Sequence, residues 1–307
     1  MSTFLATQQW AQEIQRELFE KQDYTAMSKN FSAFSNNTLF TLPESGTIEA
    51  QLDDYSRPLV ATKRTDSGKT ISLFGINTLP YYVELDEQHE LSYDKRASIT
   101  SHLVESIDDF RKQKLLWSWI NDVKWSSYSV KTTGVSGSTL ATGATGNRKK
   151  LTYNDIIKAN TMLDLQNVPS DGRILLIHAS QYSDIKQMSE FVENQVYTNE
   201  LLKSGIVGVI DGIQIKKINS NKVLVNAVAS GSTPSMASFG ATGTTYSFAS
   251  LLYHPDFVCR VVGQTEMFVN MKDALYTSDI ITMTTRLGGG AVRNDQKGLV
   301  AIVQEIA

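Results

Sequence analysis

The longest regular pattern of hydrophobic positions in the chain covers residues 93–123. Apolar side chains recur there at steps of three or four residues, which is the period of a helix with one buried face. The stripe consists of Ile99, Leu103, Ile107, Phe110, Trp117 and Ile120, and it is interrupted around Lys114. Ser92 is suited to cap the first turn. A helix of about 30 residues extends roughly 45 Å, which is longer than the core of most compact domains of comparable size.

The N-terminal residues show two different patterns. Residues 7–22 are predicted to form a helix, because Trp10, Ile14 and Leu18 stand four apart with charged residues between them. Residues 23–40 have no clear period, and three phenylalanines stand there in polar surroundings: Phe31, Phe34 and Phe40. Exposed aromatic side chains need a surface to cover them. Either this chain or a neighbouring copy of it must provide that surface.

Residues 47–76 have the pattern of extended structure and are predicted to form a long hairpin. Residues 59–62 and 70–74 are its expected strands, and residues 65–68 are its expected turn. The segment has too little apolar surface to belong to a compact core. Its charged side chains are those of Asp53, Asp54, Arg57, Lys63, Arg64, Asp66 and Lys69. A third extended piece, residues 79–91, leads into the long helix.

The second half of the chain is predicted to be an α/β region followed by strands. Two patches rich in Ser, Thr and Gly, residues 126–150 and 230–245, enclose the α/β region. Its expected elements are a helix at 152–166, a turn at 169–172, a strand at 173–178, a helix at 180–195 and a hairpin at 206–215 that turns at Asp211 and Gly212. The remainder is expected to hold strands at 257–262, 280–286 and 299–306, with a short helix or turn at 271–276.

Composition limits the class of protein without identifying it. The 307 residues are 41% hydrophobic, enough for one large domain or two modest ones, and the net charge of −3 gives no sign of a basic face for gripping nucleic acid. The single cysteine, Cys259, is expected to be a buried thiol in a protein folded in a reducing cytosol. No apolar run approaches the roughly 20 residues of a membrane helix, and residues 1–9 lack the pattern of a secretion signal.

The residues that most often carry chemistry form no recognisable site. The four histidines, His89, His102, His178 and His254, lack partners at zinc-ligand spacing. The glycine run at 288–290 is not followed by the Lys-Ser/Thr of a phosphate loop and is expected to connect two strands. Ser136 stands in a loop rather than in a nucleophile elbow, and Asp108 and Asp109 diverge by about 100° on a helix. We therefore predict that the protein is not an enzyme and has no catalytic, cofactor-binding or metal site.

The order of these elements, more than any one motif, resembles the major capsid protein of tailed bacteriophages, of the Hong Kong 97 type shared with encapsulins and the herpesvirus capsid floor. The start of that family's spine helix is similar to residues 90–96, ELSYDKR. Its axial domain has a turn, strand and hairpin that resemble residues 168–177, VPSDGRILLI, and residues 208–215, GVIDGIQI. Its returning peripheral strands are similar to residues 286–290, RLGGG, and 295–300, DQKGLV. The resemblance covers essentially the whole chain.

The resemblance implies an α+β capsid fold in five parts. These are an N-terminal arm with a short helix (1–46), an extended E-loop hairpin (47–78), the first part of a peripheral domain with the spine helix at 93–123 (79–150), an axial domain (151–255) and returning peripheral strands (256–307). The spine helix is then expected to span the capsomer edge, and the axial domain to gather at five- and six-fold axes.

The resemblance also implies the function and the partners. We expect a major head protein that self-assembles into the pentamers and hexamers of an icosahedral shell around a phage genome. Its expected location is the virion, after synthesis in the host cytoplasm. The expected partners are other copies of itself, a portal, a separate scaffold protein and, through non-specific contacts, packaged double-stranded DNA. Neither a membrane nor a cofactor is expected.

A thin shell requires each subunit to overlap its neighbours, so the arm and the hairpin are the expected contact surfaces. The candidate interface residues are Phe31, Phe34, Phe40, Arg57, Lys63, Arg64, Asp66, Lys69 and Phe74. The segment ahead of the hairpin is too short for the N-terminal scaffolding segment of some relatives, so a separate scaffold or none is expected. Some relatives crosslink an E-loop lysine to an asparagine. Lys63, Lys69 and Asn294 are available for such a bond, but we do not expect one here.

Three alternatives stay open from the sequence. An encapsulin, a bacterial compartment shell of the same fold, would form particles without scaffold or DNA; the charged hairpin and the Ser/Thr/Gly patches favour a phage capsid over it. A hydrolase or transferase with an unfamiliar site around Ser136, Cys259 or His178 would lose activity, with assembly intact, when one of them is replaced. A tail-tube or adhesin protein would be dominated by β structure, which the long predicted helix argues against.

Overall fold

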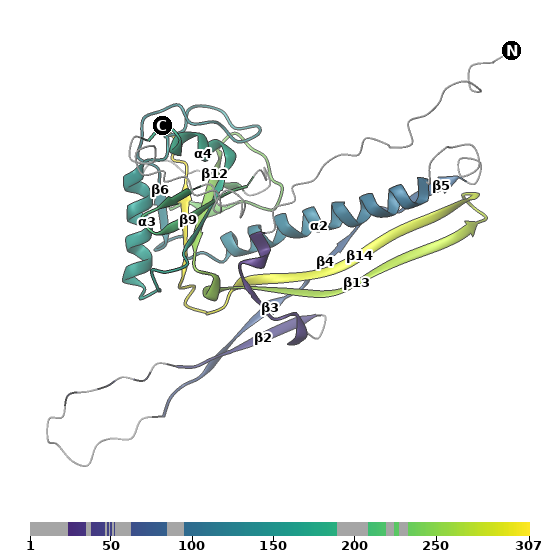
Figure 1. Ribbon diagram of the computed structural model, residues 1–307, viewed down its shortest axis with the longest axis horizontal. Coiled ribbons are helices and arrows are strands. Elements are labelled where there is room, and N and C mark those ends of the chain that lie inside the picture. Colours follow the sequence, from purple (N-terminus) through teal and green to yellow (C-terminus); the bar gives the residue numbers. More distant parts are fainter. Residues whose placement is uncertain are drawn as a thin grey trace.

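A long helix and two long strands run side by side away from a rounded α/β domain, and a second, thinner pair of strands leaves their junction in another direction (Figure 1). The computed structural model describes residues 24–34, 38–46, 48, 50, 52, 63–84, 95–188, 208–218, 224–226 and 233–307. The helix predicted at 7–22 and the hairpin residues Asp53, Asp54 and Arg57 lie outside the described residues, as does His89. The mixture of helices and sheets confirms the predicted α+β class.

The long helix predicted at 93–123 is present as α2, Lys95–Asn121. Its 27 residues contain neither glycine nor proline, and at 1.5 Å per residue it extends about 40 Å. The helix packs against the strand β14, Ser278–Ala291. Its buried apolar side chains are those of Leu103, Ile107, Leu115, Leu116, Trp119 and Ile120. The expected cap, Ser92, lies outside the described residues.

The two long strands are β13, Val258–Asp273, and β14, which pair antiparallel along nearly their whole length. β1, Lys29–Asn30, runs parallel to β13 on one side, and β4, Phe74–Asn77, and β5, Tyr81–Glu84, pair with β14 on the other. The strands predicted at 257–262 and 280–286 are therefore present but are much longer than expected. The helix or turn predicted at 271–276 is partly wrong, because β13 continues to residue 273 and only 274–277 form the turn.

The glycines at 288–290 lie inside β14, so the prediction that they connect two strands is wrong. A Cβ atom on Gly289 would overlap the Leu115 side chain and the Cys259 carbonyl oxygen. Because that atom is missing, α2 lies directly on the strands, and the indole Nε1 of Trp119 donates to the Cys259 carbonyl at 2.9 Å. The glycine run is a packing surface for the helix.

A second sheet, with strand order β11-β10-β12-β7-β9-β8, forms the rounded domain, and β15 and β6 extend it from β12. Its strands are β6 (Ser129–Lys131), β7 (Ile174–His178), β8 (Gly208–Ile210), β9 (Ile213–Ile218), β10 (Leu224–Asn226), β11 (Ser235–Met236), β12 (Tyr246–Tyr253) and β15 (Leu299–Val303). β7 and β15 confirm the strands predicted at 173–178 and 299–306, although β15 ends three residues early. β15 was expected among the returning peripheral strands, but it pairs with β12 in this sheet. The sequence pattern missed β12, which is buried from its second residue to its last.

The helix α3, Tyr153–Leu165, confirms the prediction at 152–166 and its N-cap at Thr152. Oδ2 of Asp155 accepts from the backbone N–H of Thr152 at 3.0 Å and from its hydroxyl at 2.8 Å. The other carboxylate oxygen accepts from the Thr133 hydroxyl at 2.7 Å. One buried carboxylate therefore fixes both the start of α3 and the preceding Ser/Thr/Gly-rich patch.

The predictions around β8 and α4 had mixed outcomes. Asp211 and Gly212 both have positive φ, 51° and 76°, which confirms the type I′ turn between β8 and β9. The helix predicted at 180–195 is wrong in length: α4, Ala179–Ile185, ends at Ile185. Residues 189–207 lie outside the described part of the chain.

The thinner pair of strands, which we call the hairpin ribbon, differs from its prediction. β2, Leu39–Glu44, pairs antiparallel with β3, Ser67–Ser72, so that Glu44 lies opposite Ser67. The turn predicted at 65–68 is therefore wrong, because Ser67 and Gly68 belong to β3. The expected partner strand at 59–62 lies outside the described residues, and the observed partner precedes the predicted hairpin. β13 and β14 together are called the long ribbon below.

Candidate functional site

The titratable groups that attracted attention in the sequence have structural roles. His178 and His254 cap short helices, each accepting through Nδ1 from a backbone N–H two residues on, that of Ser180 and Asp256, at 3.2 Å. Among the described residues, no three His, Cys, Asp or Glu side chains form a group that would hold a metal ion. No helix in the same part of the chain is long and apolar enough to cross a membrane.

The three residues of the hydrolase alternative lie in different surroundings. Ser136 forms an isolated bridge with Lys149 in the loop before α3. The His178 ring stacks on Phe248, with 3.8 Å between the ring centroids. Cys259 is buried, as predicted, and burial raises the pKa of its thiol to about 11. A candidate site must therefore be sought on the surface rather than in these groups.

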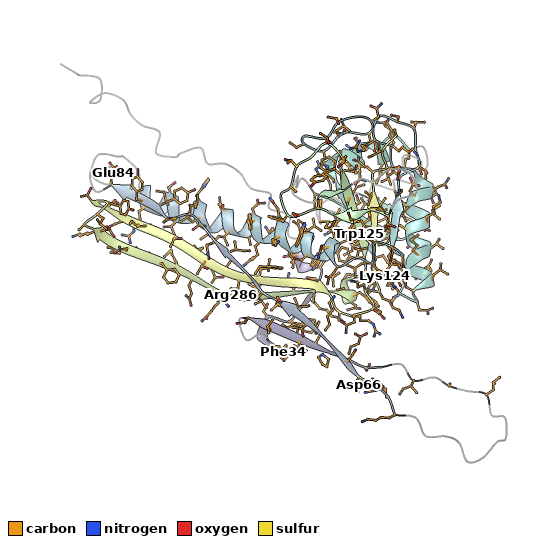
Figure 2. The ribbon with its side chains drawn as sticks, turned by 180° about the vertical axis from the view of Figure 1, so that it is seen from behind. Phe34, Asp66, Glu84, Lys124, Trp125 and Arg286 are labelled. Carbon is orange, nitrogen blue, oxygen red and sulfur yellow. The ribbon has the colours of Figure 1, made fainter. Side chains whose placement is uncertain are left out.

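The hairpin ribbon is attached to the rest of the chain by a small apolar cluster at its base. Phe40, Leu42 and Ile71 are each at most 7% exposed and pack with Cys259 and Val261 of β13. Beyond that base the ribbon leaves the molecule: Figure 2 shows Asp66 far along it, beyond the long ribbon and α2. Residues 63–66, which lead into β3 from that far end, are all exposed.

Two ion pairs set the direction in which the hairpin ribbon leaves its base. Nζ of Lys69 lies 2.6 Å from Oδ2 of Asp122, just after the end of α2, and the same oxygen accepts from the Ala291 N–H at 2.9 Å. From the other strand, Glu44 pairs with Arg293 at 2.9 Å. The ribbon is thus tied through β3 to the end of α2 and through β2 to the turn region that follows β14.

The structure changes the picture of the N-terminal arm. Phe31 stacks on Phe40 with 5.4 Å between ring centroids, and Phe40 is 6% exposed. The chain itself therefore covers these two rings, and no neighbouring copy is needed to bury Phe40. Phe34, on the short 3-10 turn Ser32–Phe34, is 75% exposed. Of the three predicted arm anchors, Phe34 alone presents most of its ring to solvent.

The remaining predicted interface residues also divide into those that make contacts inside the chain and those that are exposed to solvent. Lys69 is engaged by Asp122 within the chain, and Arg57 lies outside the described residues. Arg64 pairs with Asp66 at 2.7 Å, and both side chains are about half exposed at the far end of the hairpin ribbon. The predicted residues that present substantial surface are Phe34, Lys63, Arg64, Asp66 and Phe74.

Lys114, which interrupts the apolar stripe of α2, lies among three aromatic rings. Its Nζ is 4.7, 3.8 and 4.8 Å from the ring centroids of Phe74, Trp117 and Phe239. Burial lowers the pKa of this lysine. Trp117 in turn donates from Nε1 to the Ala237 carbonyl at 3.0 Å. The interruption in the pattern is a cation–π contact that joins α2 to β4 and to the segment before β12.

A large exposed apolar surface was not predicted from the sequence. We call it the ribbon-tip patch, because it lies at the end of the long ribbon farthest from the α/β domain and on the adjoining β5. Its members, 48–89% exposed, are Tyr81, Tyr82, Met267, Phe268, Met271, Leu275 and Tyr276. Successive residues of a strand face opposite sides, so Tyr81 with Tyr82, and Met267 with Phe268, expose apolar surface on both faces of this end. Exposed apolar surface on both faces favours association.

The tip that carries this patch is held in a defined conformation. Lys272 and Thr277, neither of them glycine, have positive φ of 53° and 47°. Side-chain oxygens support the turn between them: Asp273 accepts from the Leu275 N–H at 2.8 Å, and Asp279 accepts from the Lys272 N–H at 2.9 Å. The sequence signal was the run of Thr, Val, Met and aromatic residues on both sides of Asp273, which continues the strands beyond their predicted ends.

Comparison with known proteins gives a consistent result at the level of structure. No family model and no curated protein matches the sequence. The acidic stable capsid structure of Helicobacter pylori bacteriophage KHP30 matches with a TM-score of 0.69 at 12% identity, over 97% of this chain and 95% of that chain. The capsid structure of the cyanophage P-SCSP1u gives 0.68 at 13% identity, over 97% and 93%. A structure from Mycobacterium phage Che8 gives 0.63 at 15% identity, over 96% of both chains. These similarities confirm the predicted Hong Kong 97-type fold.

Proposed function

We propose that this chain, which has the Hong Kong 97-type capsid fold, is a major capsid protein that assembles into the icosahedral head shell of a tailed bacteriophage. The observation that carries the proposal is the extent of the similarity. Nearly all of this chain matches nearly all of phage capsid subunits, so the projecting ribbons are shared as well as the core.

The surface of the single chain supports the same conclusion. A two-stranded ribbon without a covering layer is marginally stable in water, and the hairpin ribbon has such a layer only at its base. The ribbon-tip patch leaves Leu275 89% and Tyr276 61% exposed. Both features are unfavourable in a monomer, and contact with neighbouring copies removes the disadvantage. Identical copies that cover one another in this way form closed symmetric assemblies.

In this proposal the parts of the fold have separate duties. The rounded α/β domain is the axial domain that gathers at the five- and six-fold axes of pentamers and hexamers. α2 and the long ribbon form the peripheral domain at the capsomer edge, and the hairpin ribbon is the E-loop that reaches a neighbour. The net charge of −3 fits a shell that encloses DNA through non-specific contacts. A portal, a separate scaffold and synthesis in the host cytoplasm complete the proposal.

Electron microscopy tests the proposal on protein purified after expression alone and after co-expression with the scaffold gene of its source. We expect closed shells of uniform size built from pentamers and hexamers. A protein that stays monomeric under every condition would refute it. Shells that form from the chain alone and enclose another protein, rather than DNA, would favour the encapsulin alternative.

A matched variant asks whether the hairpin ribbon is the part that closes the shell. Because Glu44 lies opposite Ser67, residues 45–66 can be replaced by Asn-Gly, a two-residue turn that preserves the β2–β3 pairs. We expect this variant to remain folded, with the circular dichroism of the parent, and to form no closed shells. Shells of normal size from the shortened chain would contradict the assignment of this ribbon as the E-loop.

A further inference from the structure

The long ribbon has an open edge on its outer strand. β1 pairs with β13 at Cys259 and Arg260, and among the described residues β14 alone pairs with the rest of β13. In an antiparallel pair, every second residue turns its N–H and C=O groups away from the partner strand. Along residues 265–270, these outward groups form an edge to which a further strand can bond.

This edge is longer and less protected than the others. The other edge strands of the two larger sheets are two to four residues long. Residues 265–270 pair regularly with β14, and a shift of register stands at each end of the stretch. The stretch contains no proline and no lysine, and Glu266 is its one charged residue. Shortness, lysine and proline are the usual protections of an exposed edge, and all three are missing here.

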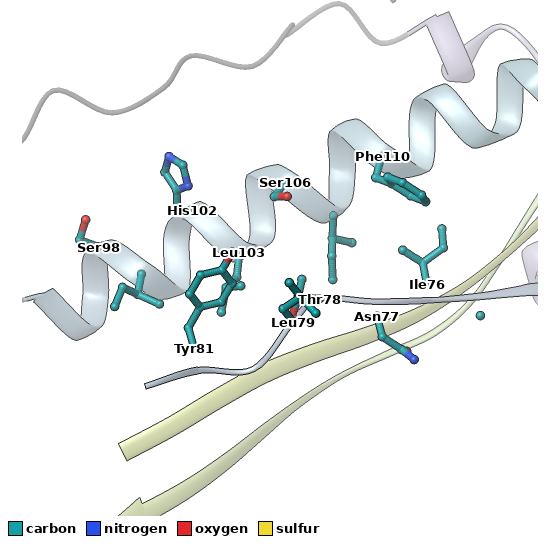
Figure 3. A pocket seen from close by; sticks show the side chains of 13 residues that line it. Ile76, Asn77, Thr78, Leu79, Tyr81, Ser98, His102, Leu103, Ser106 and Phe110 are labelled. Carbon is teal, nitrogen blue, oxygen red and sulfur yellow. The ribbon is translucent and has the colours of Figure 1, made fainter. Parts of the chain in front are cut away.

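The opposite edge of the same sheet is partly covered by the chain itself. β4 and β5 contact α2, and a groove of about 590 Å³ lies between the helix and these strands. Figure 3 shows Ile76 and Tyr81 directed from the strands toward the helix. Figure 1 shows β13 on the side of β14 away from α2. The open edge of β13 is therefore the one that a partner can reach directly.

The side chains on this edge favour a partner strand over a partner surface. Met267 and Phe268 are 48% and 53% exposed, and as neighbours in one strand they lie on opposite faces of the sheet. A surface placed against either face covers only one of them. A strand added at the edge brings side chains beside both, because cross-strand neighbours lie close together on each face.

The stretch matches itself when a second copy runs antiparallel to it. Because directly opposite residues share a face and faces alternate along a strand, the two-fold axis between identical strands passes through a residue. With the axis through Phe268, the two Phe268 rings lie opposite each other and Met267 lies opposite Val269. Glu266 then lies opposite Asn270, so every pair joins side chains of similar polarity. An axis through Met267 would instead place Glu266 opposite Phe268.

From the open edge and this self-match we infer that β13 pairs antiparallel with β13 of a second copy, across a two-fold axis at Phe268. The pairing joins two long ribbons into one continuous sheet and covers Met267 and Phe268 on both faces at once. The inference rests on the proposed function, because the second copy is a neighbouring subunit of the shell. Each contact of the interface occurs twice, as in any two-fold association of identical chains.

Single cysteines test the pairing in shells of the full-length chain. Phe268→Cys places two thiols opposite each other at the axis, at a spacing that a disulfide can bridge, and we expect disulfide-linked dimers under mild oxidation. In the controls, Glu266→Cys and Asn270→Cys, each thiol lies four residues, about 14 Å, along the strand from its counterpart. Neither control should crosslink alone, whereas shells from an equal mixture of the two proteins should. The native Cys259 is buried and does not compete.

The other outcomes separate this inference from the proposed function. Dimers from Met267→Cys in place of Phe268→Cys, or equal crosslinking of all the single variants, would overturn the pairing. Phe268→Cys shells without the disulfide would also overturn it and would leave the proposed function intact. A parent chain that forms no shells would contradict the proposed function and remove the basis of the pairing with it.

Charge at the axis gives a second test, without cysteines. Phe268→Lys and Phe268→Glu each place like charges opposite each other, and each alone should raise the concentration at which shells form about tenfold. An equal mixture places unlike charges opposite each other and should lower that concentration severalfold. The same two substitutions at Leu165, which is 80% exposed on α3, should have no effect alone or mixed. A mixture that assembles no better than either Phe268 variant would show that Phe268 does not face its own copy.

Discussion

The two ribbons of this molecule are built from the same kind of strand pair, but they are supported very differently. In the long ribbon, β14 alternates buried and partly buried positions along its length because α2 covers one face. In the hairpin ribbon, only Phe40, Leu42 and Ile71 are buried, all near the base. Strand pairing alone gives marginal stability in water. We infer that α2 supports the long ribbon along its length, whereas the chain supports the hairpin ribbon at its base.

In the proposed shell, the two ribbons would contribute to assembly in different ways. The long ribbon presents apolar side chains beside a hydrogen-bonded turn, so its contribution would depend on those side chains. The described residues beyond β2 and β3 expose both apolar side chains, Ile48 and Leu52, and charged ones, Lys63, Arg64 and Asp66, and the base of the hairpin ribbon sets the direction in which they lie. Substitutions in the long ribbon should therefore change either folding or the apolar contact, and substitutions at the base of the hairpin ribbon should change its direction.

The largest effect is expected where α2 lies on the long ribbon. Gly289→Ala forces a Cβ atom against the Cys259 carbonyl and the Leu115 side chain, and should lower the free energy of unfolding by about 2 kcal/mol or more. The control is Gly75→Ala in β4, where a Cβ atom meets nothing within 4 Å and the change should stay below about 0.5 kcal/mol. Urea unfolding measures both. Equal losses would mean that α2 does not support the ribbon through this contact.

The next effect concerns the ribbon-tip patch. Replacing Leu275 and Tyr276 together by serine should leave the free energy of unfolding unchanged within about 0.5 kcal/mol, because both side chains are mostly exposed. The concentration at which shells form should rise about tenfold, which corresponds to about 1.4 kcal/mol. Leu165→Ser, at a position 80% exposed on α3, is the control. The measurement is light scattering as a function of protein concentration. Identical assembly of the parent, the double variant and Leu165→Ser would count against a role of the patch.

The parts of the fold that were predictable from the sequence are those that neighbouring residues determine. α2 follows from its own apolar stripe and the lack of a breaker. The start of α3 follows from Thr152 and Asp155, which bond to each other three residues apart. The turn at Asp211 and Gly212 follows from the left-handed conformations that these residue types tolerate. In each case the deciding interaction lies within one turn of chain.

The parts that were missed depend on residues far apart in the sequence. Phe40 was assigned to a free arm because its cluster partners, Cys259 and Val261, stand at the other end of the chain. The strand partner of β3 was misplaced for the same reason, since a register between residues 39–44 and 67–72 leaves no local signal. Two members of the predicted interface set, Phe40 and Lys69, make contacts inside the chain instead. The ribbon-tip patch could not be predicted, because the sequence pattern did not show that β13 and β14 extend that far.

A smaller effect is expected from the ion pair at the base of the hairpin ribbon. Lys69→Met keeps the aliphatic stem but removes the ion pair, while Oδ2 of Asp122 still accepts from the Ala291 N–H. The Lys69 and Asp122 side chains are 13% and 27% exposed, so solvent screens the pair in part and the cost should be about 1 kcal/mol. Arg64→Met removes a pair that is about half exposed and should leave stability unchanged. If both variants unfold at the same urea concentration as the parent, this ion pair does not anchor the ribbon.

A change in the pH dependence of stability, rather than in stability at neutral pH, reports on the closure of the same base through Cys259. Burial raises the pKa of this thiol from an ordinary value of 9.0 to about 11. Between these pH values the unfolded chain has released the proton while the folded chain retains it, so the free energy of unfolding should fall as the pH rises from about 9 to about 11. Cys259→Ala should remove that part of the slope in urea unfolding measured across this range. Phe40→Ala, which opens the cluster over the thiol, should reduce it, because access of water brings the thiol pKa back toward its ordinary value. An unchanged slope in Phe40→Ala would mean that the long ribbon alone buries Cys259, and that the base of the hairpin ribbon is as open as its tip.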